Sequence, residues 1–280
     1  PPPDAEPLGV TREYTALHGC PPSTRSRSAR IVTDMPAVRH LRNAPITEAL
    51  VDFRVKVRDG FRAEEFAGLK ERLSDRYPIV KEHRQFEGQI AFGQNVPVSS
   101  ARDLGLWGYF FHSKDGLNVA QFRSDGFTFN RLRPYTNWDV LLPEVLRLWQ
   151  IYVETSSPDG ITRLAVRYIN RLSLPTTIAR LQGFLTAPPT PPPAYPKELA
   201  SFVTRLVVTD PLTRSSANIV QALEKQTSEG VTILLDIDVY TEDSIEVRSP
   251  GIHEILATLH KVKNDIFFGT VTDEALRPYE

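Results

Sequence analysis

Rows of arginine and acidic residues are the parts of this sequence that could do chemistry. Three arginines spaced by four lie in the segment 161–174, so a strand would place them on one face: Arg163, Arg167 and Arg171. Two acids share one face of the segment 231–240 in the same way: Asp236 and Asp238. Guanidinium groups pair with phosphate or carboxylate oxygens, and carboxylates bind divalent metal ions. The rows therefore predict either an anion site or a set of ion pairs.

Both interpretations of these rows stay open at the level of the sequence. As cross-strand ion pairs, each would stabilise the sheet by about 0.2 to 1 kcal/mol. As a binding site, the rows give the candidate ligand-binding residues Arg131, Arg167, Asn170 and Arg171. The candidate cofactor is a divalent metal, held by Asp236 and Asp238. Glu48 and Asp52 add acidic groups on one face of the first patterned segment.

Other reactive residue types give weaker signals. His253 and His260 are seven residues apart, about 10 Å along a helix, which is too far for one metal ion. We expect solvated or helix-capping roles for both. Cys20 is the one cysteine, so a disulfide within the chain is excluded. The sequence also lacks glycine-rich phosphate loops, a nucleophile elbow and zinc-binding motifs, which lowers the expectation of an enzyme.

The hydrophobic pattern predicts the elements that must position these residues. Alternation of apolar and polar residues from Ile46 to Lys56 is typical of a half-buried strand. Two Asp-Gly turns, Asp115-Gly116 and Asp125-Gly126, predict hairpins. Further strands are expected at 79–93, 107–113, 117–123, 126–133, 161–174, 201–209, 214–224 and 231–240. Helices are expected at 61–77, from Asn137 to about 156, at 176–185 and at 252–268.

This element order predicts an α+β fold of antiparallel sheets with packed helices. The order suggests two pseudo-repeated β-α-β-β-β-α units that form one continuous curved sheet; the alternative is a chance likeness within a single domain. We expect a disordered or non-native extension at 1–43, with Met35 as a natural start or with a flexible basic arm as the rival interpretation. The first half covers 44–160, and the second covers 161–280 with a Pro-rich loop at 186–198.

Composition excludes several classes of protein. The 280 residues include 33 basic and 34 acidic ones, with a formal charge of -1, so no overall field attracts nucleic acid or an anionic membrane. No apolar run reaches the roughly 20 residues that cross a bilayer, and the first residues do not resemble a signal peptide. A cytoplasmic protein without a membrane partner is the expectation.

Five spaced segments carry a resemblance to a known family. They are Asn43–Ala49, Asp125–Leu132 with Pro134, Tyr135 and Trp138, Arg167–Arg171, Leu235–Tyr240, and Leu259–Lys261 with Phe267, Phe268, Thr272 and Asp273. These segments resemble a sporadically distributed family of conserved bacterial proteins without an established function. The resemblance covers residue 40 to the C-terminus. It implies an accessory role, because patchy distribution is typical of genes on mobile elements.

Three hypotheses about function follow. The first is a non-catalytic binding module whose Arg-rich sheet face takes a small anionic ligand or a protein partner. The second is a metal-dependent enzyme for a phosphorylated or nucleotide substrate, with Asp236 and Asp238 on the metal and Arg131, Arg167 and Arg171 on phosphate. The third is a nucleic-acid-binding protein, which needs a continuous basic strip that the neutral charge balance does not favour. Pairing of every carboxylate with an arginine would remove the metal site.

Overall fold

A single antiparallel sheet organises the chain. The computed structural model describes residues 39, 41–92, 97–191 and 199–280. Within them, nine strands form a sheet in the order β2-β3-β4-β5-β1-β6-β9-β8-β7. Their bounds are β1 Ile46–Lys56, β2 Ile79–Phe92, β3 Pro97–His112, β4 Asn118–Arg123, β5 Gly126–Leu132, β6 Gly160–Leu174, β7 Val203–Asp210, β8 Ser215–Gln226 and β9 Val231–Thr241. The predicted α+β class with an antiparallel sheet is therefore confirmed.

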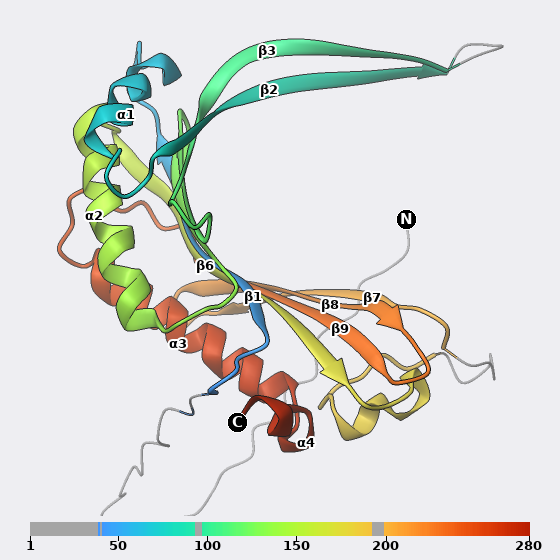
Figure 1. Ribbon diagram of the computed structural model, residues 1–280. Helices are drawn as coiled ribbons and strands as arrows, with labels where there is room; N and C mark the ends of the chain where they lie inside the picture. The colour runs from blue at the N-terminus through green and yellow to red at the C-terminus, as the bar shows by residue number, and fades with distance from the viewer. Residues whose placement is uncertain (1–38, 40, 93–96, 192–198) are drawn as a thin grey trace, which may run out of the picture. The chain divides into compact units, whose positions relative to one another are not determined.

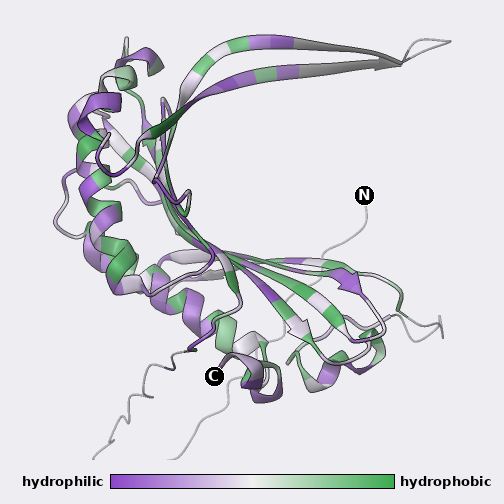
Figure 2. Cartoon of the chain, viewed as in Figure 1, coloured by the Kyte–Doolittle hydropathy of each residue, from purple (hydrophilic) through white to green (hydrophobic). Residues whose placement is uncertain are grey.

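The two strands β1 and β6 lie side by side in the middle of the sheet (Figure 1). Val51 of β1 is directly opposite Val166 of β6, and both are fully buried. The neighbouring pair, Asp52 and Ala165, points to the other face, because side chains alternate along a strand. Figure 2 shows this alternation of hydrophobic and hydrophilic residues along the strands. The alternation separates an apolar face from a polar one.

Two long helices cover the apolar face of the sheet (Figure 1). They are α2, Trp138–Ser156, and α3, Ile252–Thr270. The side chain of Asn137 caps α2 by accepting a hydrogen bond from the Val140 amide, as its position in the sequence predicts. Trp149 of α2 stacks on Phe53 of β1 with ring centroids 4.2 Å apart. Such contacts fix α2 against the strands whose polar residues point the other way.

The short helical segments differ from the prediction. In place of one helix at 61–77, the chain forms a 3-10 segment, η1 at Ala63–Gly68, and one α-helical turn, α1 at Leu69–Arg72. The expected helix at 176–185 is also 3-10, η2 at Ile178–Gly183. The C-terminus adds α4, Asp273–Leu276, and η3, Arg277–Tyr279. Short segments held by a few buried side chains, such as Phe66 and Leu181, do not need full α-helical turns.

The two predicted halves contribute to one sheet, but the predicted pseudo-repeat is not confirmed. Residues 1–38, with Cys20 and Met35, lie outside the described residues, as do 192–198 of the Pro-rich loop.

Among the described residues, no helix combines the length and the apolar composition that a membrane crossing requires.

Candidate functional site

The polar face of the sheet, opposite α2 and α3, gathers most of the predicted site residues; we call it the open face. It is defined by the charged side chains of the central strands: Glu48, Asp52 and Arg54 of β1, Arg163, Arg167 and Arg171 of β6, and Asp236 and Asp238 of β9. The strand register explains this gathering, since Arg167 lies directly opposite Asp238. Residues on the same face of adjacent strands are close enough to interact directly or diagonally.

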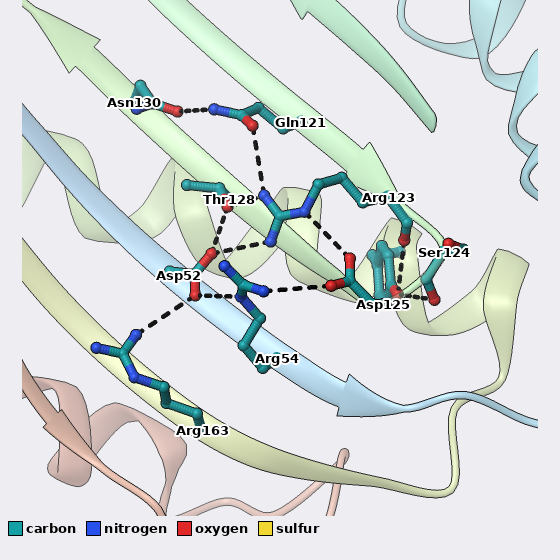
Figure 3. A network of polar contacts seen from close by, with 10 residues as sticks. Asp52, Arg54, Gln121, Arg123, Ser124, Asp125, Thr128, Asn130 and Arg163 are labelled. Carbon is teal, nitrogen blue, oxygen red and sulfur yellow. Dashed lines mark hydrogen bonds and ion pairs between the residues drawn. The ribbon is translucent and has the colours of Figure 1, made fainter. Parts of the chain in front are cut away.

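Asp52 is the centre of a buried network on the open face (Figure 3). Its carboxylate accepts hydrogen bonds from Arg123 Nη2 at 3.0 Å and from Arg54 Nε at 3.0 Å. The Thr128 hydroxyl donates to the same carboxylate, and Arg163 Nη1 lies 3.6 Å from it. Three strands besides β1 therefore supply groups to one acid.

Arg123 is the most buried cation of this network, with a side chain that is 5% exposed. It also donates to Gln121, and its Nε lies 3.3 Å from Asp125. Burial alone would raise the pKa of Asp52, but the Arg123 charge, the Thr128 hydrogen bond and Arg54 together hold this pKa below its usual value. Asp52 is therefore an anion at neutral pH, and it compensates the buried Arg123.

The β6 and β9 strands form a second set of ion pairs. Arg167 binds Asp236 through two hydrogen bonds, and its Nε lies 2.8 Å from Oδ1. Arg163 Nη2 donates to Asp238 at 2.8 Å. Burial raises the pKa of Asp238 although Arg163 and Arg167 lower it, and the nearby Asp236 carboxylate raises it further. The pKa of Asp238 is therefore raised on the same face on which the pKa of Asp52 is lowered.

In most of these pairs, the carboxylate lies deeper than the arginine. The side chain of Arg54 is 46% exposed and its partner Asp52 only 9%. Arg167 is 41% exposed and Asp236 is 12%. The open face therefore presents guanidinium N–H groups to solvent, while most of the neutralising oxygens lie underneath.

A shallow depression of about 340 Å³ lies over this network. Four arginines and two aspartates are among the residues that line it: Leu50, Asp52, Arg54, Gln121, Arg123, Thr128, Asn130, Arg163, Arg167 and Asp238. The other acidic partners, Asp125 and Asp236, are not among these residues. The lining therefore has more arginines than aspartates, while the carboxylates of Asp125 and Asp236 neutralise Arg54 and Arg167 from outside it.

Aromatic rings border two of the arginines. The Arg123 guanidinium lies 5.3 Å from the centroid of Trp107, and that of Arg163 lies 4.3 Å from the centroid of Tyr240. Cation–π contacts of this kind hold a guanidinium in place. Next to Trp107, burial and the Arg123 charge lower the pKa of His83. His83 is therefore neutral at pH 7 and adds no charge to the network.

The structure separates the predicted ligand-binding residues. Arg167 and Arg171 lie on the open face as expected, but Arg131 and Asn170 lie on the opposite, helix-covered face. Arg131 of β5 lies directly opposite the fully buried Ala49 of β1 in the strand register. Its guanidinium donates to the Pro134 carbonyl and to Asn118. The predicted grouping of all four on one surface is wrong. The alternation of side chains along each strand places Arg131 and Asn170 on the face that the helices cover.

Asn170 has a structural role on the helix-covered face. It is 2% exposed, and its Nδ2 donates to the backbone carbonyls of Tyr168 and Leu235. A buried amide in these contacts satisfies backbone groups and leaves no donor for a ligand.

The geometry does not support the predicted metal site. Asp236 accepts two hydrogen bonds from Arg167, and Asp238 accepts one from Arg163. A metal ion at these oxygens would have to displace guanidinium groups. Among the residues that the structure describes, no three His, Cys, Asp or Glu side chains are grouped as metal ligands.

The expected role of His260 is also corrected. His260 of α3 stacks on Trp138 of α2, with centroids 4.2 Å apart and planes 5° from parallel. Burial, and then the Lys263 charge, lower its pKa to about 3, so the ring is neutral at ordinary pH. His260 is a packing residue between two helices, neither solvated nor a cap.

Arg123, the most buried cation of the network, is not among the residues that the sequence predicted for the site. A signal was present, because Gln121 and Arg123 alternate with the apolar Ala120 and Phe122, which are fully buried. An arginine at the end of such a strand, directly before an Asp-Gly turn, lies on the polar face. The local pattern did not show that β4 lies two strands from β1, where Arg123 reaches Asp52.

Comparisons with known proteins add no identification. No family model matches the chain, and no match was found among curated proteins. The resemblance to the sporadically distributed bacterial family therefore stays a prediction, as does the cytoplasmic location.

Proposed function

We propose that this chain is a non-catalytic binding module whose open face takes a small polyanionic ligand in the depression over Asp52. One observation carries the proposal: four arginines and two aspartates line the depression, and the exposed guanidinium groups lie above more buried carboxylates. Arginine forks suit phosphate and carboxylate groups because they donate two parallel hydrogen bonds.

The ion pairs hold the arginines in place before a ligand binds. A free arginine side chain loses considerable rotamer freedom when it is ordered. Here Asp52 and Asp236 already fix Arg54 and Arg167 from below. An anion that binds the exposed N–H groups would therefore order little further structure, which favours affinity.

Metal-dependent catalysis and nucleic-acid binding are less well supported. The candidate metal ligands are ion-paired, and the described residues of the open face alternate acids with arginines. A continuous basic strip, which phosphate backbones require, does not form on the central strands.

The strand order favours the pseudo-repeat as a further proposal. Each half places its first strand next to its last, β1 beside β5 and β6 beside β9, and the two first strands pair in the middle. On this proposal, the site lies where two equivalent strands meet.

Calorimetric titration of the full chain with tripolyphosphate and with citrate at low ionic strength tests the proposed function. We expect binding that weakens with added salt and that falls at least tenfold in Arg167→Gln. Arg171→Gln is the matched control, because Arg171 lies on the same strand and face, is 46% exposed and paired with Glu224, but does not line the depression. Absence of heat with both probes, or equal losses in the two variants, would overturn the proposal.

A further inference from the structure

The edge strand β7 exposes apolar residues on both of its faces. The exposed fractions are 57% for Leu206, 57% for Val207 and 46% for Val208, and Val203 is 74% exposed. Polar residues at an edge normally oppose association through the free strand edge. In β7, the three consecutive residues 206–208 are all apolar.

The opposite edge of the sheet differs in this respect. Strand β2 carries charged side chains along its described part: Lys81, Glu82, Arg84 and Glu87. Charged side chains of this kind protect an edge against pairing with another strand. Charged residues separate the exposed Ile79 and Phe86 of β2, whereas β7 has three consecutive exposed apolar residues, so β7 is the edge better suited to pairing.

The backbone of β7 has hydrogen-bonding groups that point away from the sheet. The Leu223 amide of β8 donates to the Phe202 carbonyl at 3.1 Å, so these opposite residues form a hydrogen-bonded pair. Hydrogen-bonded and non-hydrogen-bonded pairs alternate along antiparallel strands. Val203, Arg205, Val207 and Thr209 therefore direct their N–H and C=O groups toward the free edge.

We propose that β7 pairs antiparallel with β7 of a second copy of this chain, with Val207 opposite Val207 on the twofold axis. In this register, the outward backbone groups of Val207 face each other, and Arg205 faces Thr209 of the second copy. Leu206 then lies opposite Val208, so the apolar residues contact each other on both faces. Because the apolar residues 206–208 face one another in this register, a second copy of the chain is the occupant that fits them.

The symmetry of this pairing has a consequence for the open face. A twofold axis between antiparallel strands is perpendicular to the sheet, so both copies keep the same face on the same side. Val207 lies opposite Asn218, and Asn218 lies opposite Asp238 of the open face. The two open faces would therefore form one continuous surface across the dimer.

Sedimentation equilibrium of the full chain over a range of concentrations tests the association. We expect a dimer whose dissociation constant rises at least tenfold in Val207→Lys, because the two lysines would meet on the axis. Phe86→Lys is the matched control, since Phe86 is 61% exposed on the opposite edge strand. A wild-type chain that stays monomeric at every concentration, or equal weakening by both variants, would overturn the proposal.

Disulfide trapping tests the register even if the lysine variant folds poorly. Hydrogen-bonded antiparallel pairs have Cα atoms about 5.5 Å apart, within the range that a disulfide spans. In a Cys20→Ser background, which removes the native cysteine, Val207→Cys should form a covalent dimer on mild oxidation. Val203→Cys, four residues from the axis, should not. Equal trapping at both positions would contradict the register.

Discussion

The buried ion pair between Arg123 and Asp52 is the residue-scale feature on which the open face depends. Both side chains are less than one-tenth exposed, at 5% and 9%. Taking two charges out of water carries a large desolvation penalty, which close contact and further hydrogen bonds offset. Gln121, Thr128 and Asp125 supply those further contacts. Loss of either partner would leave the other as a buried charge without full compensation.

Arg123→Met should lower the free energy of unfolding by about 3 to 5 kcal/mol, because it leaves the Asp52 carboxylate buried with fewer partners. Urea denaturation measures this change. Asp52→Asn added to Arg123→Met should lose less than the sum of the two single changes, since the partners are coupled. Arg84→Ala, which removes an exposed pair with Asp103, should change the midpoint little. Strict additivity of the double variant would contradict the coupling.

Stability should also fall in acid as Asp52 becomes protonated. The pKa of Asp52 in the folded protein is lower than in the unfolded chain, where an aspartate has a pKa of about 3.9. The unfolded chain therefore binds more protons in this window, and the contribution of Asp52 is lost as pH falls through the folded pKa. Unfolding measured between about pH 5 and pH 2 should show a shallower decline in Asp52→Asn than in the wild type. Identical slopes would argue against Asp52 as the titrating group.

At the scale of elements, the contact of α3 with β6 contains a buried cation. Lys263 is 5% exposed, and its Nζ lies 3.7 Å from the centroid of Tyr168 and 2.5 Å from Asn264 Oδ1. Burial lowers its pKa to about 7. Tyr135 donates or accepts at the Tyr168 hydroxyl, and the neutral His260 packs on the same ring. No carboxylate contact is present among these described groups, so the ammonium is held mainly by the ring and one amide.

Stability should rise with pH between about 7 and 9, because the unfolded chain keeps Lys263 protonated while the folded chain releases the proton. Lys263→Met should flatten this rise and stabilise the protein at pH 7, since the charged form no longer has to be buried. Thermal unfolding across this pH range is the measurement. Lys261→Met is the matched control, because Lys261 is exposed on the same helix and paired with Asp265. A pH profile that Lys263→Met leaves unchanged would contradict the prediction.

Strand pairing also depends on Gly108 of β3. A Cβ at Gly108 of β3 would lie 2.0 Å from the Phe122 carbonyl oxygen of β4, so Gly108→Ala must push the two strands apart. We expect a loss of more than about 2 kcal/mol in urea denaturation. Gly269→Ala in α3 has open space around the new atom and should stabilise the helix by about 0.5 to 1 kcal/mol. Similar effects of the two changes would show that backbone approach is not the cause.

Local patterns predicted the elements well and their neighbours poorly. Alternation identified β1, β5, β6 and β9, and the Asp-Gly turns located the hairpin β4–β5, because these signals depend on residues close in sequence. Arg131 was placed with Arg167 although it shares its face with the buried Phe127 and Phe129. Whether residues of two strands lie on the same face of the sheet depends on how those strands pair and in which register. The spacing of residues within one segment does not contain this information. Arg123 was missed for the same reason.

At the scale of the whole molecule, the two predicted halves share one sheet through β1 and β6. These strands pair from Ile46 to Lys56, and their buried residues lie in the same core. Separation at residue 160 would expose a central strand on each side. The open face would be divided as well, since Asp52 and Arg163 would belong to different fragments.

Neither 41–160 nor 161–280 should therefore fold alone. Circular dichroism and one-dimensional NMR of each fragment should show no cooperative unfolding and little dispersion, while a mixture of both should regain native-like spectra. A cooperative thermal transition in either isolated fragment would show that the half is an independent domain, and would support the predicted domain boundary at residue 160.

The central position of β1 also sets the timing of its assembly during synthesis. β1 ends at Lys56, its first partner β5 begins at Gly126, and its second partner β6 begins at Gly160. At about 5 to 20 residues per second, the ribosome makes β5 several seconds after β1. Throughout that interval the apolar row of Val51 and Phe53 has no partner strand, so the nascent chain carries an unpaired hydrophobic segment until β5 and β6 have been made.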